Sequence, residues 1–128
     1  MTATGRVGEE RPRMTQFEAK TTDEGGLVRV ALAGECDLAV SAQLDKVLAA
    51  ALDRGPLVVV DLAALAFLDS SGVHGLITAH HAARRKGSRL VAVNASGAVA
   101  TVLELTGVGR LLGSPPNGDG AARDGAGG

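Results

Sequence analysis

The sequence predicts an α/β fold, a small sandwich in which helices pack on a mixed, mostly parallel sheet of about four to five strands that begins with an N-terminal β-hairpin. Short apolar runs rich in valine alternate along the chain with amphipathic stretches, as strands and helices do in such folds. The chain has 128 residues, which favours one domain that is large enough to bury a core. Hydrophobic residues make up 45% of it, yet there are only two Phe and no Trp or Tyr, so the core must be built from layered aliphatic elements.

The two ends of the chain are expected to be tails. Residues 1–13 mix Gly, Arg and Glu without periodicity, and residues 114–128 are rich in Gly, Ala and Pro. Such segments bury too little apolar surface to offset the entropy that ordering would cost. We therefore expect a folded domain at residues 14–113, between a flexible N-terminal tail and a disordered C-terminal tail.

The first elements predict the hairpin. Residues 14–20 form a weak strand, and the Asp and Gly residues within 21–26 favour a turn. Residues 27–33 alternate enough between apolar and polar side chains to form a half-buried strand. Gly34 is expected to break that strand.

Helical periodicity predicts a first helix over residues 41–55, which Gly55 and Pro56 end. Its apolar face consists of Leu44, Val47, Leu48, Ala51 and Leu52. The valine-rich run at residues 57–63 then indicates a strand that is covered on both faces.

Residues 64–68 are expected to lead out of the sheet into a second helix, which begins at Ser71 or Gly72 and ends near Lys86. Its apolar face consists of Val73, Leu76, Ile77, His80 and Ala83. Residues 88–94 predict a further buried strand. Because one helix joins it to the preceding strand, the two strands should be parallel.

A third helix is expected over residues 96–107, with Gly107 as the residue that ends it. Its apolar residues are Val99, Val102, Leu103 and Leu105. Residues 108–113 fit a short last strand or a turn. The expected order of elements is β-β-α-β-α-β-α.

The composition argues against binding of nucleic acid and against a metal site. The net charge is −1, the pI is near 6.3, and there are few aromatic rings on which bases could stack. A local basic cluster is explained by the preference of cations for a helix C-terminus. It consists of His80, His81, Arg84, Arg85 and Lys86. Because the two histidines are adjacent, they point in different directions and make a poor metal pair.

The sequence also argues against a membrane or secreted protein. No apolar run approaches the roughly 18 residues of a membrane span, and the N-terminus has no apolar segment of a signal peptide. Cys36 is the only cysteine, so no internal disulfide can form, which fits a reducing compartment. We expect a cytoplasmic protein that does not associate with a membrane.

Enzyme signatures are missing as well. There is no phosphate-binding loop and no dinucleotide-binding glycine motif. No glycine stands two residues before Ser70 or Ser71, so neither serine lies in a nucleophile elbow. His74 could pair with one of these serines on a helix, but no oxyanion donor and no orienting acid other than Asp69 can be identified. We therefore expect no enzymatic activity and no cofactor.

The stretch FLDSSGVHG, residues 67–75, has two interpretations. It lies at a strand-to-helix turn on the carboxyl edge of the parallel strands, where open α/β sheets form binding sites. Asp69 or Ser70 could simply cap the helix. A cap does not explain Gly72 and Gly75, which would leave the backbone bare for the close approach of a partner.

Three segments resemble the signature of STAS domains, especially the small bacterial anti-sigma factor antagonists. The main one is VVVDLAALAFLDSSGVHGLI, in which an apolar strand, an Asp-Leu pair and a spacer precede Asp-Ser-Ser-Gly. LAGECDLAVSAQL resembles the family's Gly-Glu-aliphatic-Asp segment, with Cys36 at the aliphatic position, and VLELTGVGRLL resembles the family's ending. The resemblance covers roughly residues 15–112.

This resemblance implies a function. In the family, the serine directly after the Asp is phosphorylated by a partner anti-sigma factor that is also a serine kinase, and here that residue is Ser70. The unphosphorylated protein would bind the anti-sigma factor and release a sigma factor, so that it regulates transcription by partner switching. A phosphatase of the PP2C type would reset it. The alternative is a STAS-type structural or scaffold module in a transporter-associated or stress-signalling assembly, which does not act directly on a sigma factor.

The resemblance also implies a partner-binding surface around the phosphorylation site. Its residues would be Asp37, Asp69, Ser71, Gly72, His74 and Gly75. Asp37 matches the acidic residue that the family has in the loop near the acceptor serine. His74 stands where many members have Gly.

Overall fold

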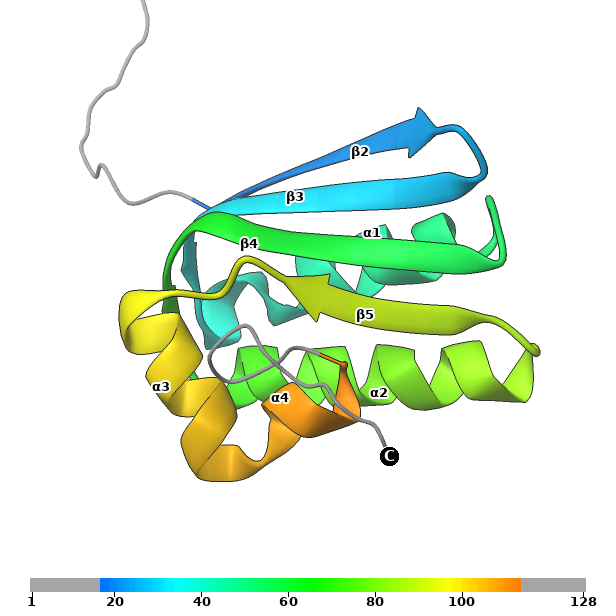
Figure 1. The fold of residues 1–128 in the computed structure, drawn as a ribbon. Coiled ribbons are helices and arrows are strands. Elements are labelled where there is room, and N and C mark those ends of the chain that lie inside the picture. Colours follow the sequence, from blue (N-terminus) through cyan, green and yellow to red (C-terminus); the bar gives the residue numbers. More distant parts are fainter. Residues whose placement is uncertain (1–16, 114–128) are drawn as a thin grey trace, which may run out of the picture.

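The computed structural model describes residues 17–113 (Figure 1). The tails expected at residues 1–13 and 114–128 lie outside the described residues. The elements are β2 (Glu18–Glu24), β3 (Leu27–Cys36), the 3-10 helix η1 (Leu38–Val40), α1 (Ser41–Leu52), β4 (Leu57–Leu68), α2 (Ser70–Arg85), β5 (Arg89–Val93), α3 (Gly97–Thr106) and α4 (Val108–Leu111). This order confirms the predicted alternation of strands and helices and adds two short helices.

The strands form one mixed sheet in the order β2-β3-β4-β5. β2 pairs with β3 antiparallel, whereas β3, β4 and β5 are parallel to one another. The predicted α/β fold with an N-terminal hairpin is thus confirmed. The turn of the hairpin is shorter than expected, because Gly25 and Gly26 both have positive φ and close it with two residues. Residues 21–24, expected in the turn, extend β2 instead.

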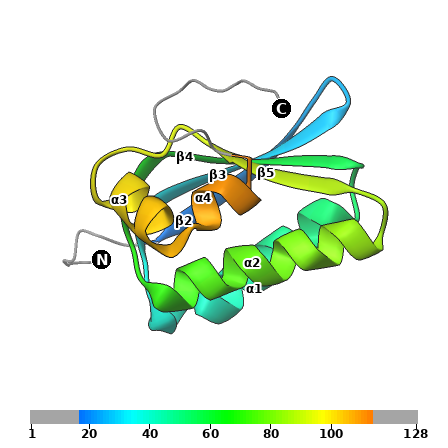
Figure 2. The ribbon, with the colours of Figure 1, turned by 60° about the horizontal axis from the view of Figure 1, so that its bottom comes forward.

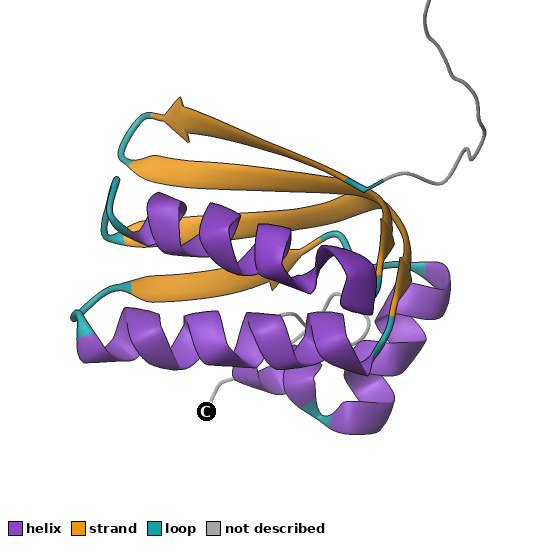
Figure 3. Ribbon diagram, turned by 180° about the vertical axis from the view of Figure 1, so that it is seen from behind, coloured by secondary structure: helices purple, strands orange, loops and turns teal. Residues whose placement is uncertain are grey.

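Two helices, α1 and α2, lie side by side against one face of the sheet (Figures 2 and 3). The side chains that β3 and β4 direct to that face are fully buried aliphatics. They are Val28, Val30, Leu32, Val58, Val60 and Leu62. α3 packs against β4, and α4 packs against α3 and α2. No helix of the described part is long and apolar enough to cross a membrane.

The strand expected at residues 57–63 is not covered on both faces along its length. Val58, Val59 and Val60 are buried, but Asp61 keeps part of its surface exposed and Ala63 is exposed. Burial on both faces is therefore limited to the first half of the strand.

Both central strands are longer than expected. Gly34 does not end β3; its φ of +90° accommodates a register shift, and the strand continues to Cys36. Residues 64–68 do not leave the sheet but remain paired with β3, so that Leu68 lies opposite Cys36. β4 bends along this irregular segment and ends at the start of α2 (Figure 1).

The C-terminal part also differs from expectation. Gly107 ends α3 with a φ of +76°, as predicted, but residues 108–113 contain the helix α4 rather than a strand or a turn. Val108 and Leu112 are buried in the core, and the Leu112 carbonyl accepts a hydrogen bond from the Ala92 N–H (3.0 Å). Leu105, expected on the apolar face of α3, is 81% exposed.

Asp61 in β4 is hydrogen-bonded to residues of β3, of β4 and of the segment that follows β5. Its carboxylate accepts hydrogen bonds from the Ala63 N–H (3.0 Å), from Asn94 Nδ2 (3.1 Å) and from Arg29 Nη1 (3.2 Å). These donors lower the pKa of Asp61, with the Ala63 N–H contributing most. Asp61 therefore stabilises the fold more as a carboxylate than as a carboxylic acid.

We expect the variant Asp61→Asn to lower the free energy of unfolding by about 0.5–1.5 kcal/mol at pH 7. Because the folded pKa lies below the unfolded value, the stabilisation by the carboxylate is complete above the unfolded pKa, about 4, and is lost as the pH falls through the folded pKa. Urea unfolding of both proteins at pH 7 and near pH 3 should show the difference shrinking. The control at pH 7 is Glu104→Gln, at an exposed position of α3. It should lower the free energy of unfolding by less than about 0.5 kcal/mol. An Asp61→Asn difference that stays constant with pH contradicts the account.

Candidate functional site

The carboxyl ends of β3 and β4 meet at one edge of the sheet, and an Asp follows each strand. Cys36 and Leu68 are the last paired residues, and the Asp69 N–H donates to the Cys36 carbonyl (3.1 Å). Asp37 accepts a hydrogen bond from the Ala39 N–H (3.0 Å) and so caps η1. The parallel arrangement thus brings together two acidic residues that lie 32 positions apart in the sequence.

Asp69 is the cap of α2. Its backbone is extended, and its Oδ1 accepts hydrogen bonds from the Ser71 N–H (2.9 Å) and the Gly72 N–H (3.2 Å). The choice left open between Asp69 and Ser70 is therefore decided in favour of Asp69. Ser70 is the first residue of the helix, is exposed, and makes no side-chain hydrogen bond to any other described residue.

Gly72 and Gly75 are required by packing inside the protein. Both are buried. A Cβ on Gly72 would lie 2.4 Å from Leu68 Cδ1 and 2.9 Å from Cys36 Sγ, and a Cβ on Gly75 would lie 3.0 Å from Leu44 Cδ2. These contacts explain both glycines by the close packing of α2 on β3, β4 and α1, and their expected role in the approach of a partner stays a prediction.

A surface hollow of about 250 Å³, called the Ser70 hollow below, lies beside the start of α2. It is lined by Leu38, Ser41, Asp45, Ser70, Ser71, His74 and Gly75. Four of the seven expected site residues lie here, namely Ser70, Ser71, His74 and Gly75. The other three do not line it: Asp37 caps η1 directly before Leu38, Asp69 caps α2 directly before Ser70, and Gly72 follows Ser71 and is buried. The structure therefore brings four of the expected residues together in one hollow.

Three residues of the hollow were not expected from the sequence. Leu38, Ser41 and Asp45 come from η1 and α1, and only the tertiary fold places them opposite α2. Leu38 is 72% exposed, which is unusual for a large aliphatic side chain next to polar ones. It offers an apolar contact point at the rim of the hollow.

Within residues 17–113, no hydrogen bond joins His74 to either serine of the hollow, and no group of three or more potential metal ligands occurs. Burial, together with the negative charges of Asp69, Asp37 and Asp45, raises the pKa of the Cys36 thiol to about 11. The thiol is therefore protonated and unreactive near neutral pH.

Comparison with known proteins identifies the family to which the chain is similar. A family model described as "Mlab, STAS domain" matches residues 20–113. An anti-sigma factor antagonist from Mycobacterium paratuberculosis is 26% identical with a TM-score of 0.65, over 75% of this chain and 82% of that one. None of the curated proteins compared with the chain matches it.

Solved structures with lower identity share the fold. The anti-sigma factor antagonist SpoIIAA in its unphosphorylated form is 21% identical with a TM-score of 0.64, over 83% of this chain and 89% of that one. The Bacillus cell fate determinant SpoIIAA in its phosphorylated form is 20% identical with a TM-score of 0.59, over 83% of this chain and 92% of that one. A sulfate transporter family protein from Wolinella succinogenes is 18% identical with a TM-score of 0.57, over 66% and 69%.

The division of roles between Asp69 and Ser70 can be tested by stability. Asp69→Ala removes the acceptor of two helix N–H groups and should lower the free energy of unfolding by about 1 kcal/mol. Ser70→Ala, the matched control one residue later, should change it by less than about 0.5 kcal/mol, since its hydroxyl bonds to no other described residue. Urea denaturation at pH 7 measures both. A larger loss for Ser70→Ala than for Asp69→Ala would show that Ser70 is the structural cap.

Proposed function

Since the chain belongs to the STAS domain family, we propose that it acts as an anti-sigma factor antagonist. In its unphosphorylated form it binds an anti-sigma factor that is also a serine kinase, and so releases a sigma factor. Phosphorylation of Ser70 by that partner ends the interaction, and a phosphatase restores it. The proposal concerns recognition and switching rather than catalysis by this chain.

One observation carries the proposal, namely the state of Ser70. Its side chain is exposed at the first position of α2, while Asp69 does the capping that Ser70 might otherwise do. A serine that is accessible and not needed by the fold is suited to be a modification site. The likeness to the anti-sigma factor antagonist from Mycobacterium paratuberculosis, at 26% identity, supports a role as an anti-sigma factor antagonist.

A phosphate at Ser70 is compatible with the fold. It would lie at the N-terminus of α2, where the helix dipole favours an anion. The fold therefore has no reason to open when Ser70 is modified. The effect of the phosphate must instead be sought at the surface.

The same phosphate would change that surface strongly. Asp37, Asp45 and Asp69 already lie around the Ser70 hollow, and a phosphoserine adds a charge of about −1.5 to −2. A partner that covers the hollow would have to bury this charge next to other negative charges. Such a mismatch at an interface costs about 2–5 kcal/mol, which weakens affinity about 30-fold to several thousandfold. This is enough to switch binding on and off.

Leu38 gives the partner an apolar contact beside the charged one. It is 72% exposed at the rim of the Ser70 hollow, and exposed apolar side chains of this kind gain free energy when a partner covers them. We expect Leu38 to contribute to affinity and Ser70 to regulate it.

The alternative role, as a scaffold module in a transporter-associated or stress-signalling assembly, rests on the fold alone. The sulfate transporter family protein that resembles the chain is 18% identical, which shows shared architecture but no shared partner. That role does not require a charge at Ser70 to control binding. The following experiment therefore separates the two roles.

We expect the anti-sigma factor kinase with Mg-ATP to add one phosphate to the protein, on Ser70. Titration calorimetry at fixed salt should then give similar affinities of the partner for wild type and Ser70→Ala, at least a 30-fold loss for the phosphorylated protein, and a smaller loss for Ser70→Asp, because one carboxylate carries less charge than a phosphate.

His81→Asp is the matched control, because it adds one negative charge to an exposed position of the same helix, six residues beyond Gly75, the last residue of α2 that lines the hollow. It should leave the affinity within about threefold of wild type. Mapping of the phosphate to Ser71, or equal affinities for wild type and the phosphorylated protein, would contradict the proposal.

A further inference from the structure

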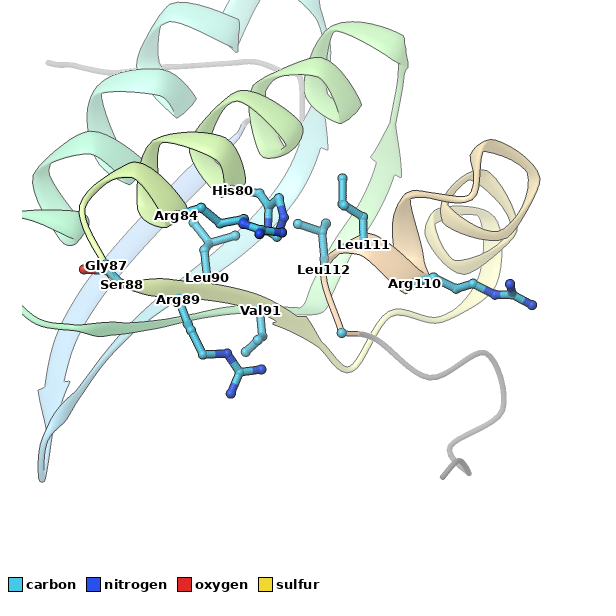
Figure 4. Close-up of a pocket in the computed structure, with 11 residues that line it drawn as sticks. His80, Arg84, Gly87, Ser88, Arg89, Leu90, Val91, Arg110, Leu111 and Leu112 are labelled. Atoms are coloured by element: carbon cyan, nitrogen blue, oxygen red, sulfur yellow. The ribbon is translucent and has the colours of Figure 1, made fainter. Parts of the chain in front are cut away.

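A second concave surface lies toward the other end of α2 (Figure 4). This groove of about 510 Å³, called the β5 groove below, runs along the outer edge of β5 between the C-terminal half of α2 and α4. It shares no lining residue with the Ser70 hollow. The two surfaces can therefore be occupied independently.

The charges around the β5 groove are all of one sign. Arg84 from α2, Arg89 from β5 and Arg110 from α4 line it, and no Asp or Glu does. None of the three forms a salt bridge with a described residue, whereas Arg29 and Arg54 are both ion-paired. Since the whole chain has a net charge of −1, this is a local segregation of charge.

The helix dipole does not account for this cluster. It explains why cations gather in the last turn of α2, which contains Arg84 and Arg85. Arg89 and Arg110 belong to other elements and still border the same groove. The fold thus brings together three arginines from three elements, a pattern that needs a different explanation.

The directions of the arginines indicate the shape of the ligand. In Figure 4, Arg84 lies next to His80 between α2 and α4, while the ends of Arg89 and Arg110 lie well apart from it and from one another. Donors that converge on one point would suit one small anion, but these do not converge. Spread charges suit an extended chain that carries several carboxylates.

The rest of the groove suits a peptide as well. β5 is the edge strand next to β4, and although its Ala92 N–H is bonded to the Leu112 carbonyl, an extended segment can lie along the side chains of this edge. Leu111, 40% exposed, adds an apolar contact within the groove. Burial lowers the pKa of His80, and the neighbouring His81 and Arg84 lower it further. His80 therefore lines the groove as a neutral side chain, and the arginines supply the positive charge.

We infer that the β5 groove is a docking site for an acidic segment of a partner protein, an extended stretch in which several Asp or Glu residues flank an apolar side chain. The three arginines would pair with the carboxylates, and Leu111 would contact the apolar side chain. This site is separate from the Ser70 hollow and is independent of the state of Ser70. A partner could use it as a second anchor, which raises overall affinity without new contacts at the switch.

The test uses the fluorescein-labelled heptapeptide EELELEE as probe and fluorescence anisotropy at low salt as the measurement. Wild type should bind it, and the triple variant Arg84→Ala, Arg89→Ala, Arg110→Ala should bind it roughly tenfold more weakly, as expected for three exposed ion pairs. The matched control is Lys20→Ala, Lys46→Ala, Arg85→Ala, which removes the same charge from exposed positions outside the groove. It should lose less than about threefold, the amount expected from net charge alone. Circular dichroism confirms that both variants are folded.

Other outcomes would overturn the inference. An equal loss in both triple variants would mean that the peptide senses only net charge. Displacement of the peptide by inorganic phosphate at low millimolar concentration would identify a site for small anions. Binding of vesicles with anionic phospholipid but not of the peptide would identify a lipid surface, and binding of neither would leave the groove without a ligand. Ser70→Asp should bind the peptide as wild type does, so failure of this inference is distinct from failure of the proposed switch.

Discussion

The start of α2 is held against the ends of β3 and β4 by a contact that leaves no room for a side chain at Gly72. Leu68 and Cys36 fill the space where its Cβ would be, and the Asp69 N–H is bonded to the Cys36 carbonyl. The same turn directs the Asp69 carboxylate to two helix N–H groups. The position of the helix, and with it the exposure of Ser70, follows from this packing.

This geometry separates what stabilises the site from what regulates it. Asp69 caps α2, and Gly72 and Gly75 are buried in the packing of that helix. The Ser70 hydroxyl lies at the surface and forms no hydrogen bond with another described residue. A charge placed on that hydroxyl changes the surface without removing any internal contact. Toward the other end of the same helix, the arginines of the β5 groove form a second surface of opposite charge. The two surfaces thus lie toward opposite ends of α2.

The sequence predicts most of the fold because local patterns specify it. The hairpin, the order of elements and the three longer helices follow from valine-rich runs and from leucines at helical spacing. The length of β4 does not, because residues 64–68 stay in the sheet through pairing with residues 33–36 of β3, across two irregularities in the register. The sequence does not predict the helix α4, because the apolar residues Val108 and Leu112 are compatible with either a strand or a helix. Their burial in the tertiary fold decides between the two.

The site shows the same limit. The Asp-Ser-Ser-Gly motif locates Ser70, but it does not tell which residue caps the helix or why glycines follow. Leu38 and Asp45 could not be found, because nothing local in the sequence links η1 and α1 to the start of α2. The three arginines of the groove likewise lie on separate elements, and only their arrangement in space marks them as a group.

The central claim is that charge at Ser70 alters the surface and leaves the fold intact. The most direct measurement compares ¹H–¹⁵N NMR spectra of the unmodified protein with those of protein in which phosphoserine has been incorporated at Ser70. The account predicts chemical-shift changes confined to residues 37–45 and 69–75, with α2 still helical from its first turn and the signals of β2 and of the β5 groove unchanged. Changes that spread through the sheet, or loss of helical shifts at the start of α2, would show that phosphorylation acts by refolding and would contradict the account.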